Sequence, residues 1–265
     1  MKLATFVPRG SETVLAGEVS GHHVTAFANG ATVLDKLATG DPTPAHGESW
    51  PLSDVRLLAP VPRPRAIFGI GLNYASHAAE QGAEQPEAPI VFQKTPSASA
   101  PPDGPVRVPG VVRRLDYEGE LAVVMGAGGA VAGFAVADDV TARDLQRREP
   151  QWTRAKGADT FCPWGPWVTT ADELGGVGGA EALQLRTWVN GDLRQDASTN
   201  DLIFGVEALV RFLLETITLE PGDLILTGTP SGVGFALDPP SFLEPGDRVR
   251  IEIERLGSIE HEISG

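Results

Sequence analysis

The stretch DYEGELAVVM, residues 116–125, combines two carboxylates with an apolar run. Valine and leucine fit a pleated surface that is covered on both faces, so this run predicts a buried β-strand. Side chains alternate along a strand, and Glu118 and Glu120 therefore project from one face, with only Gly119 between them. Buried neighbouring carboxylates tolerate one another when a cation lies between them, and hard oxygen ligands favour Mg²⁺, Mn²⁺ or Ca²⁺. Taken alone, the pattern also fits the solvated face of an edge strand.

The overall composition favours a folded, turn-rich protein. With 265 residues, 42% of them hydrophobic, the chain can form one large domain, or one domain with a small appendage. Its 31 glycines and 22 prolines indicate many turns, which suit a β-rich fold. Short apolar patches separated by turn signals predict a small β-rich N-terminal domain at residues 1–58. The segment PVPRP at residues 60–64 marks its boundary with a second domain at residues 59–265.

Charge and cysteine content limit the expected partners and compartment. The net charge of −14 argues against nucleic acid or an anionic membrane as a partner, because both require a basic surface. A small anionic substrate is still allowed, since a metal ion and a few local cations can reverse the field inside a pocket. The single cysteine, Cys162, cannot form an internal disulfide, and no signal peptide or membrane span is expected. We therefore expect a cytoplasmic protein.

Hydrophobic patterning predicts the main elements of the second domain. A buried strand is expected at residues 66–70, and further strands are expected at 106–112 and 183–189, the last followed by an Asn-Gly hairpin turn. Residues 200–215 carry apolar side chains at helical spacing and predict the clearest helix. Residues 154–163 are expected to form a mixed polar and aromatic loop.

A candidate general base lies in the segment GLNYASHAAE, residues 71–80. Asn73 is expected to cap a short helix, on which His77 and Glu80 would lie three residues apart on one face. A histidine oriented by a carboxylate is a competent general base. The alternative is an ion pair on the surface of an exposed helix.

Acidic residues are concentrated after a strand predicted at residues 131–137. Asp138, Asp139 and Asp144 fall within seven residues, and such a density implies positive charge nearby.

Polar groups of other kinds follow these acids. A short helix predicted at residues 141–148 would place Arg143 and Gln146 on one side. Lys156 is either a solvated lysine or an anchor for a substrate oxygen. The segment TGTPSGVG, residues 227–234, suits anion binding through backbone N–H and hydroxyl groups, or is a simple turn.

Several motifs occur together and in order along residues 60–265. They are GLNY at 71–74 leading to His77 and Glu80, DYEGEL at 116–121, DVTARD at 139–144, KG at 156–157 with FCP at 161–163, and TGTP at 227–230. Together these motifs resemble the fumarylacetoacetate hydrolase family, in particular its bacterial branch of acylpyruvate hydrolases and 2-hydroxyhepta-2,4-diene-1,7-dioate isomerases.

The resemblance implies a mixed α/β, β-rich fold, in which a mixed β-sandwich roll carries a small β-rich N-terminal section. It also implies a homodimer and a Mg²⁺ or Mn²⁺ cofactor, with Ca²⁺ as a substitute.

The resemblance also implies roles for individual residues. It assigns the metal ligands to Glu118, Glu120 and Asp139, with Asp138 in reserve because many relatives carry asparagine at that position. The catalytic residues that it implies are His77, Glu80 and Lys156. The substrate-binding residues that it implies are Arg143, Gln146, Lys156 and Thr229.

Three functions compete at this point. The first is hydrolysis of a C–C bond in a β-diketo or 2-oxo acid of the acylpyruvate or fumarylacetoacetate type, in aromatic-compound catabolism. In that reaction His77 would activate water, and the metal would stabilise an enolate. The second is decarboxylation or isomerisation of oxaloacetate or a hydroxymuconate-type diene acid at the same metal site. The third is non-catalytic binding of a metabolite. All three imply a small anionic oxo acid as ligand.

Overall fold

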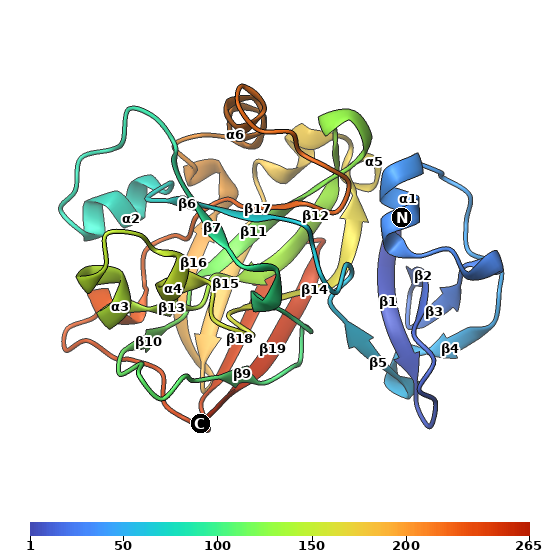
Figure 1. The fold of residues 1–265 in the computed structure, drawn as a ribbon, viewed down its shortest axis with the longest axis horizontal. Helices are drawn as coiled ribbons and strands as arrows, with labels where there is room; N and C mark the ends of the chain where they lie inside the picture. The colour runs from blue at the N-terminus through green and yellow to red at the C-terminus, as the bar shows by residue number, and fades with distance from the viewer.

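The computed structural model describes the backbone of residues 1–265 and every side chain except that of Asn29. Two large sheets dominate the fold, and a short strand pair, β10 (Leu115–Asp116) with β13 (Thr141–Ala142), lies beside them (Figure 1). The larger sheet runs in the order β4 (Ser49–Pro51), β3 (His23–Ala26), β2 (Leu15–Ser20), β1 (Lys2–Pro8), β14 (Cys162–Thr170), β12 (Val131–Asp138), β11 (Gly119–Met125), β17 (Leu224–Leu226), β6 (Ile67–Gly71) and β7 (Ile90–Lys94), with β5 (Val55–Leu58) paired to β1 and β8 (Ser99–Ala100) paired to β14.

The smaller sheet packs against β11 and β12 of the larger sheet, the strands that carry the carboxylates described below. Strand β12 contacts two of its strands, and β11 contacts a third. Every residue of β11 is buried, which explains why its sequence is continuously apolar after the second glutamate. Most neighbouring strands are antiparallel, while β17 pairs with β6 in parallel, so the sheet is mixed as predicted. The smaller sheet runs in the order β16 (Asp192–Ser198), β15 (Gln184–Val189), β18 (Arg248–Ile253), β19 (Gly257–Ser264) and β9 (Val106–Arg107).

Short helices connect and cover the strands. Helix α6 lies at the top of the view in Figure 1, and α2 and α3 lie at its left. None of the helices in the described residues is both long enough and apolar enough to cross a membrane. The α-helices are α1 (Val33–Thr39), α2 (Ala75–Glu80), α3 (Arg143–Arg148), α4 (Thr153–Lys156), α5 (Ala171–Leu174) and α6 (Val206–Leu214). The 3₁₀ helices are η1 (Ala28–Gly30), η2 (Leu52–Asp54), η3 (Pro96–Ala98), η4 (Ala127–Gly129), η5 (Val177–Ala180), η6 (Thr199–Asp201) and η7 (Gly234–Ala236).

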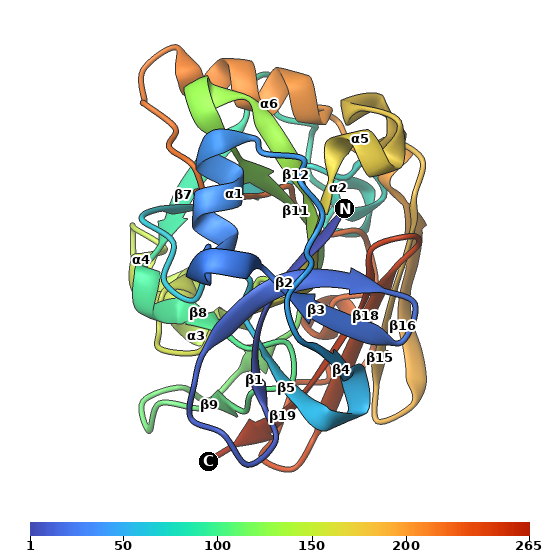
Figure 2. The ribbon, with the colours of Figure 1, turned by 90° about the vertical axis from the view of Figure 1, so that its right-hand side faces the viewer.

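The N-terminal section continues the larger sheet. Strand β1 pairs antiparallel with β14, with Leu3 opposite Val168. Figure 2 shows β1–β5 and α1 in front of the other strands, at one end of the molecule. The predicted boundary falls at the end of β5, and independent folding of residues 1–58 stays a prediction.

Several predicted elements differ in extent from the structure. Helix α1 was not expected; Thr32 and Asp35 cap its start reciprocally, and Gly40 ends it in a left-handed conformation. The strand predicted at residues 106–112 was wrong beyond Arg107, since Pro109 cannot donate a ladder hydrogen bond.

The predictions for residues 200–215 and 154–163 were also only partly right. In the first range the α-helix is confined to Val206–Leu214, because η6 and an extended segment precede it. In the second range α4 ends at Lys156 and β14 begins at Cys162, so ordered elements occupy both ends of the predicted loop.

The prediction that Asn73 caps α2 was wrong. Helix α2 starts at Ala75, and Tyr74 occupies the cap position without a side-chain hydrogen bond. Asn73 instead is fully buried: its amide donates to the carbonyl groups of Phe204 and Thr227 at 3.0 and 2.8 Å, and its Oδ1 accepts from the Phe204 N–H at 2.8 Å. It thereby joins the pocket rim to the segments before α6 and after β17.

Replacing Asn73 with alanine should lower the free energy of unfolding by about 3 kcal/mol, because one buried and two partly buried backbone groups would lose their partner. Denaturant unfolding followed by circular dichroism measures this change. The control is Asn200→Ala, at an exposed position, which should change stability little. Equal stabilities of the two variants would contradict the bridging role of Asn73.

Candidate active site

The register of β11 and β12 brings three carboxylates together. Gly119 lies opposite Asp138 across the two strands, and the Asp139 N–H donates to the Glu118 carbonyl at 2.9 Å. Asp139 therefore emerges beside Glu118 and Glu120. One carboxylate oxygen from each of the three residues lies within 4.8 Å of the other two, and all three residues are buried. The sequence-predicted ligand set is thus one spatial cluster.

The reserve candidate, Asp138, lies outside this cluster. Its Oδ1 accepts from the Glu118 N–H at 2.8 Å, and its Oδ2 lies 3.1 Å from Nε2 of the buried His261 on β19. Asp138 thus holds the backbone of Glu118 in place, and Asp139 supplies its carboxylate to the cluster.

Gly119 separates the two glutamates because no side chain fits there. A Cβ at this position would lie 2.3 Å from Thr187 Oγ1 and 3.1 Å from Gln195 Oε1. The Gly119 N–H donates to Gln195 Oε1 at 3.0 Å, and its carbonyl accepts from the Thr229 hydroxyl at 2.9 Å. Gln195 also donates to that hydroxyl at 2.8 Å. Thr229 therefore lines the pocket with a hydroxyl that supports the backbone of β11.

Two buried lysines contact the cluster. The Lys156 ammonium lies 2.6 Å from Glu118 Oε2 and also contacts Asp139 Oδ2. The Lys94 ammonium lies 2.5 Å from Asp139 Oδ1. Burial disfavours a charged lysine, yet the charges of Asp139 and Glu118 outweigh it and raise the pKa of Lys156. The structure thus places Lys156 beside the predicted ligands, and its role toward a substrate stays a prediction. Lys94 was not predicted as a site residue, because it is an ordinary last residue of a short strand.

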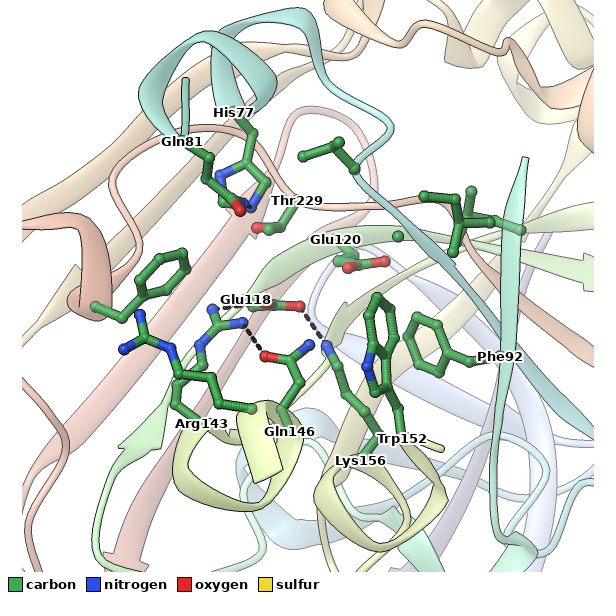
Figure 3. A pocket seen from close by; sticks show the side chains of 16 residues that line it. His77, Gln81, Phe92, Glu118, Glu120, Arg143, Gln146, Trp152, Lys156 and Thr229 are labelled. Carbon is green, nitrogen blue, oxygen red and sulfur yellow. Dashed lines mark hydrogen bonds and ion pairs between the residues drawn. The ribbon is translucent and has the colours of Figure 1, made fainter. Parts of the chain in front are cut away.

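Arg143 holds the other side of Glu118. Its Nη2 lies 2.6 Å from Glu118 Oε1, and its Nε donates to Asp116 Oδ2 at 2.9 Å. Its Nη1 donates to Gln146 Oε1 at 3.0 Å, as the predicted helix spacing implies. Figure 3 shows Glu118 between Arg143 and Lys156. Although burial opposes ionisation, the charges of Arg143 and Lys156 hold the pKa of Glu118 well below its usual range.

Glu120 is the carboxylate of the cluster whose negative charge is not offset by a paired cationic side chain within the described residues. Its Oε2 accepts from the Gly228 N–H at 2.7 Å, and no cationic side chain pairs with it among the described residues. Burial, together with the charges of Asp139 and Glu118, raises the pKa of Glu120 well above its usual range. A divalent cation among the three carboxylates would supply the missing positive charge, so an all-oxygen cluster of this kind fits such an ion.

The predicted His77–Glu80 pair is formed on α2. His77 Nδ1 lies 3.0 Å from Glu80 Oε2, and Glu80 Oε1 accepts from the Gly232 N–H at 2.8 Å. Gln81 Nε2 lies 2.6 Å from the other ring nitrogen, Nε2 of His77. This arrangement leaves Nε2 as the proton-accepting atom, with a carboxamide in front of it. Gln81 carried no sequence signal, because a glutamine at a helix end is ordinary.

Glu118, Glu120, Arg143, Lys156 and His77 line one cavity of about 340 Å³, a size typical of small-molecule sites. One wall is apolar and aromatic: Phe92 and Trp152 pack edge to face with ring centroids 5.4 Å apart. The opposite wall is polar, and Figure 3 shows His77 and Gln81 on one side of Glu118 and Gln146 on the other. The lining residues are Ile70, Gly71, Leu72, His77, Gln81, Ile90, Phe92, Glu118, Glu120, Arg143, Gln146, Arg147, Trp152, Lys156, Thr229 and Phe235.

A family model described as fumarylacetoacetate (FAA) hydrolase C-terminal matches residues 66–264, which include every residue of this cavity. The chain belongs to the fumarylacetoacetate hydrolase family. The family resemblance and the β-rich mixed α/β fold predicted from the sequence are thereby confirmed.

Several known proteins resemble the chain over most of its length. Oxaloacetate tautomerase YisK of Bacillus subtilis is 42% identical over 262 residues, covering 88% of this chain and 86% of the relative. The crystal structure of 5-carboxymethyl-2-hydroxymuconate delta-isomerase from Mycobacterium smegmatis is 35% identical, with a TM-score of 0.81 over 100% of this chain and 99% of that one. Fumarylacetoacetate hydrolase from Exiguobacterium antarcticum is 31% identical, with a TM-score of 0.89 and the same coverage.

Divalent metal should stabilise the folded protein. At free Mg²⁺ or Mn²⁺ of about 100 times the dissociation constant, binding contributes about 2.7 kcal/mol, or roughly 5–10 °C in Tm for a chain of this size. Differential scanning calorimetry with and without EDTA measures the shift. Glu120→Gln should abolish it without lowering the metal-free Tm, because the amide removes an uncompensated acid. Glu215→Gln, at an exposed position, should keep the shift. A full shift in Glu120→Gln would exclude the cluster as the metal site.

Proposed function

We propose that this family member is a divalent-metal-dependent tautomerase that interconverts the keto and enol forms of a small 2-oxo acid such as oxaloacetate. The observation that carries the proposal is a single cavity lined by Glu118 and Glu120 of the carboxylate cluster, by the buried cations Arg143 and Lys156, and by His77, which Glu80 contacts from outside the lining. The similarity to YisK over most of both chains supports tautomerisation in preference to hydrolysis.

The carboxylate cluster defines the reacting end of the cavity. Glu118, Glu120 and Asp139 would hold Mg²⁺ or Mn²⁺, with Ca²⁺ as a substitute. When bound, such an ion supplies Lewis-acid polarisation of a 2-oxo group.

The buried cations would bind and orient the substrate at this end. The raised pKa of Lys156 keeps it an ammonium, which would donate a hydrogen bond to the substrate oxygen as negative charge develops there. Arg143 and Gln146 present N–H groups to the same cavity and would fix the adjacent carboxylate. The aromatic wall of Phe92 and Trp152 excludes water from the opposite side.

His77 is the base in this proposal. Its Nε2 would take a proton from carbon 3 of the keto form and later release that proton to solvent. The Lys156 ammonium would stay charged and hydrogen-bond the developing enolate oxygen, which takes up a proton from solvent to give the enol. Glu80 stabilises the resulting imidazolium through Nδ1, and the Gly232 N–H holds Glu80 in place. Because the Gln81 carboxamide lies against Nε2, it has to rotate away before the base reaches carbon 3.

Hydrolysis is the second candidate. The same His77–Glu80 pair can activate a water for attack on the distal carbonyl of an acylpyruvate, and the similarity to fumarylacetoacetate hydrolase from Exiguobacterium antarcticum supports this candidate. The remaining alternatives are decarboxylation of oxaloacetate, isomerisation of a hydroxymuconate-type diene acid, which the similarity to the Mycobacterium smegmatis isomerase supports, and non-catalytic binding of an oxo acid.

Direct assays separate these functions. The purified protein with Mg²⁺ should accelerate loss of the ultraviolet absorbance of enol-oxaloacetate without forming pyruvate, and EDTA should abolish the effect. Pyruvate from oxaloacetate would indicate decarboxylation, and pyruvate with acetate from acetylpyruvate would indicate hydrolysis. Binding without turnover of either compound would leave a metabolite-binding protein.

Replacing His77 with alanine should reduce tautomerisation by about 10²- to 10⁴-fold, the range for loss of a general base. Mn²⁺ affinity, measured by electron paramagnetic resonance, should be unchanged, because His77 is not among the clustered carboxylates. His22→Ala, in an exposed turn, should retain full activity. Loss of Mn²⁺ binding in His77→Ala would refute this division of roles.

A further inference from the structure

Arg147 differs from the other cations of the cavity in having no acidic partner. Lys156 pairs with two cluster carboxylates, and Arg143 pairs with Asp116 and Glu118. Arg147 lines the same cavity, yet within the described residues its guanidinium forms neither an ion pair nor a hydrogen bond. The chain has a net charge of −14 and therefore many acids that could pair with an arginine. A guanidinium that lines a cavity without such a pair can bind an anionic group of a ligand.

The position of Arg147 is nevertheless defined. Its guanidinium carbon lies 5.4 Å from the centre of the Phe235 ring, and that of Arg143 lies 4.4 Å from the same ring. The His77 ring meets Phe235 edge to face at 6.4 Å. Phe235 therefore holds the inner arginine, the outer arginine and the base in one group.

The helix sets the separation between the two arginines. Arg143 and Arg147 are four residues apart on α3, so they share a face and their Cα atoms are about 6 Å apart along the axis. Arg143 is buried at the carboxylate cluster, whereas Arg147 is exposed at the outer part of the cavity. A ligand that reaches both ends needs a second anionic group beyond its 2-oxo acid end.

We propose that Arg147 binds the distal carboxylate of the substrate and so selects dicarboxylic 2-oxo acids over monocarboxylic ones. This inference rests on the proposed function in one respect, namely that the 2-oxo acid end of the substrate lies at the carboxylate cluster. The planar guanidinium of an arginine can donate two parallel hydrogen bonds to one carboxylate. The substrate would not have to displace an acidic side chain from Arg147, because none pairs with it in the described residues. Arg147 is thus a specificity-determining residue separate from the proton-transferring groups.

The test compares a dicarboxylate with a monocarboxylate that shares its reacting end. Exchange of carbon-3 protons in D₂O, followed by NMR, is measured for oxaloacetate and 2-oxobutyrate with the Mg²⁺-loaded protein. Arg147→Gln should raise KM for oxaloacetate about 10- to 100-fold with kcat nearly unchanged, because a charged hydrogen bond made equally in ground and transition states is lost. The kcat/KM for 2-oxobutyrate should change less than about twofold, and Arg147→Lys should restore part of the loss.

The matched control is Arg148→Gln, on the same helix. Arg148 is exposed, does not line the cavity and lies 3.6 Å from Glu149. It should leave both substrates unaffected. Equal effects of Arg147→Gln on both substrates, or no effect on either, would overturn the assignment.

A failure of the proposed function can be told apart from a failure of the Arg147 assignment. If the unmodified protein exchanges protons of neither compound, calorimetric binding of 2-oxoglutarate and 2-oxobutyrate to the Mg²⁺-loaded protein decides the role of Arg147. Tighter binding of the dicarboxylate, lost in Arg147→Gln, supports the role. Equal affinities in the unmodified protein reject it.

Discussion

The repulsion among three buried carboxylates is the constraint on which the site depends. One carboxylate oxygen from each of Glu118, Glu120 and Asp139 lies within 4.8 Å of the other two, in an interior that gives little solvation. Two lysines and an arginine offset part of that charge, which leaves Glu120 as the group that most needs a further cation. The protein therefore combines fixed cations, which contact the cluster, with a set of carboxylates that could hold a divalent ion.

Much of this site follows from local sequence patterns. Alternation along a strand places Glu118 and Glu120 on one face, and helical spacing pairs His77 with Glu80, so both relations are visible without a structure. The family motifs then select Asp139 over its neighbour, and the hairpin register explains that choice. These features depend on residues close in sequence, or on one strand pairing.

The groups that sequence reasoning missed act across long separations. Lys94 meets Asp139 from a strand 45 residues away, and Gln195 reaches Gly119 from 76 residues away. Asn73 was assigned a local capping role, yet its partners lie 131 and 154 residues away. Nothing in the local pattern of a lysine, glutamine or asparagine reports such contacts, because they arise when separate layers pack together.

The pairing of β1 with β14 has a consequence beyond the active site. Removing residues 1–58 would take away the strand that covers Val168 and Thr169, and would leave their backbone N–H and carbonyl groups on an open sheet edge. Open edges recruit strands from other molecules. The N-terminal section thus covers a strand edge of the larger sheet, even though none of its residues lines the cavity.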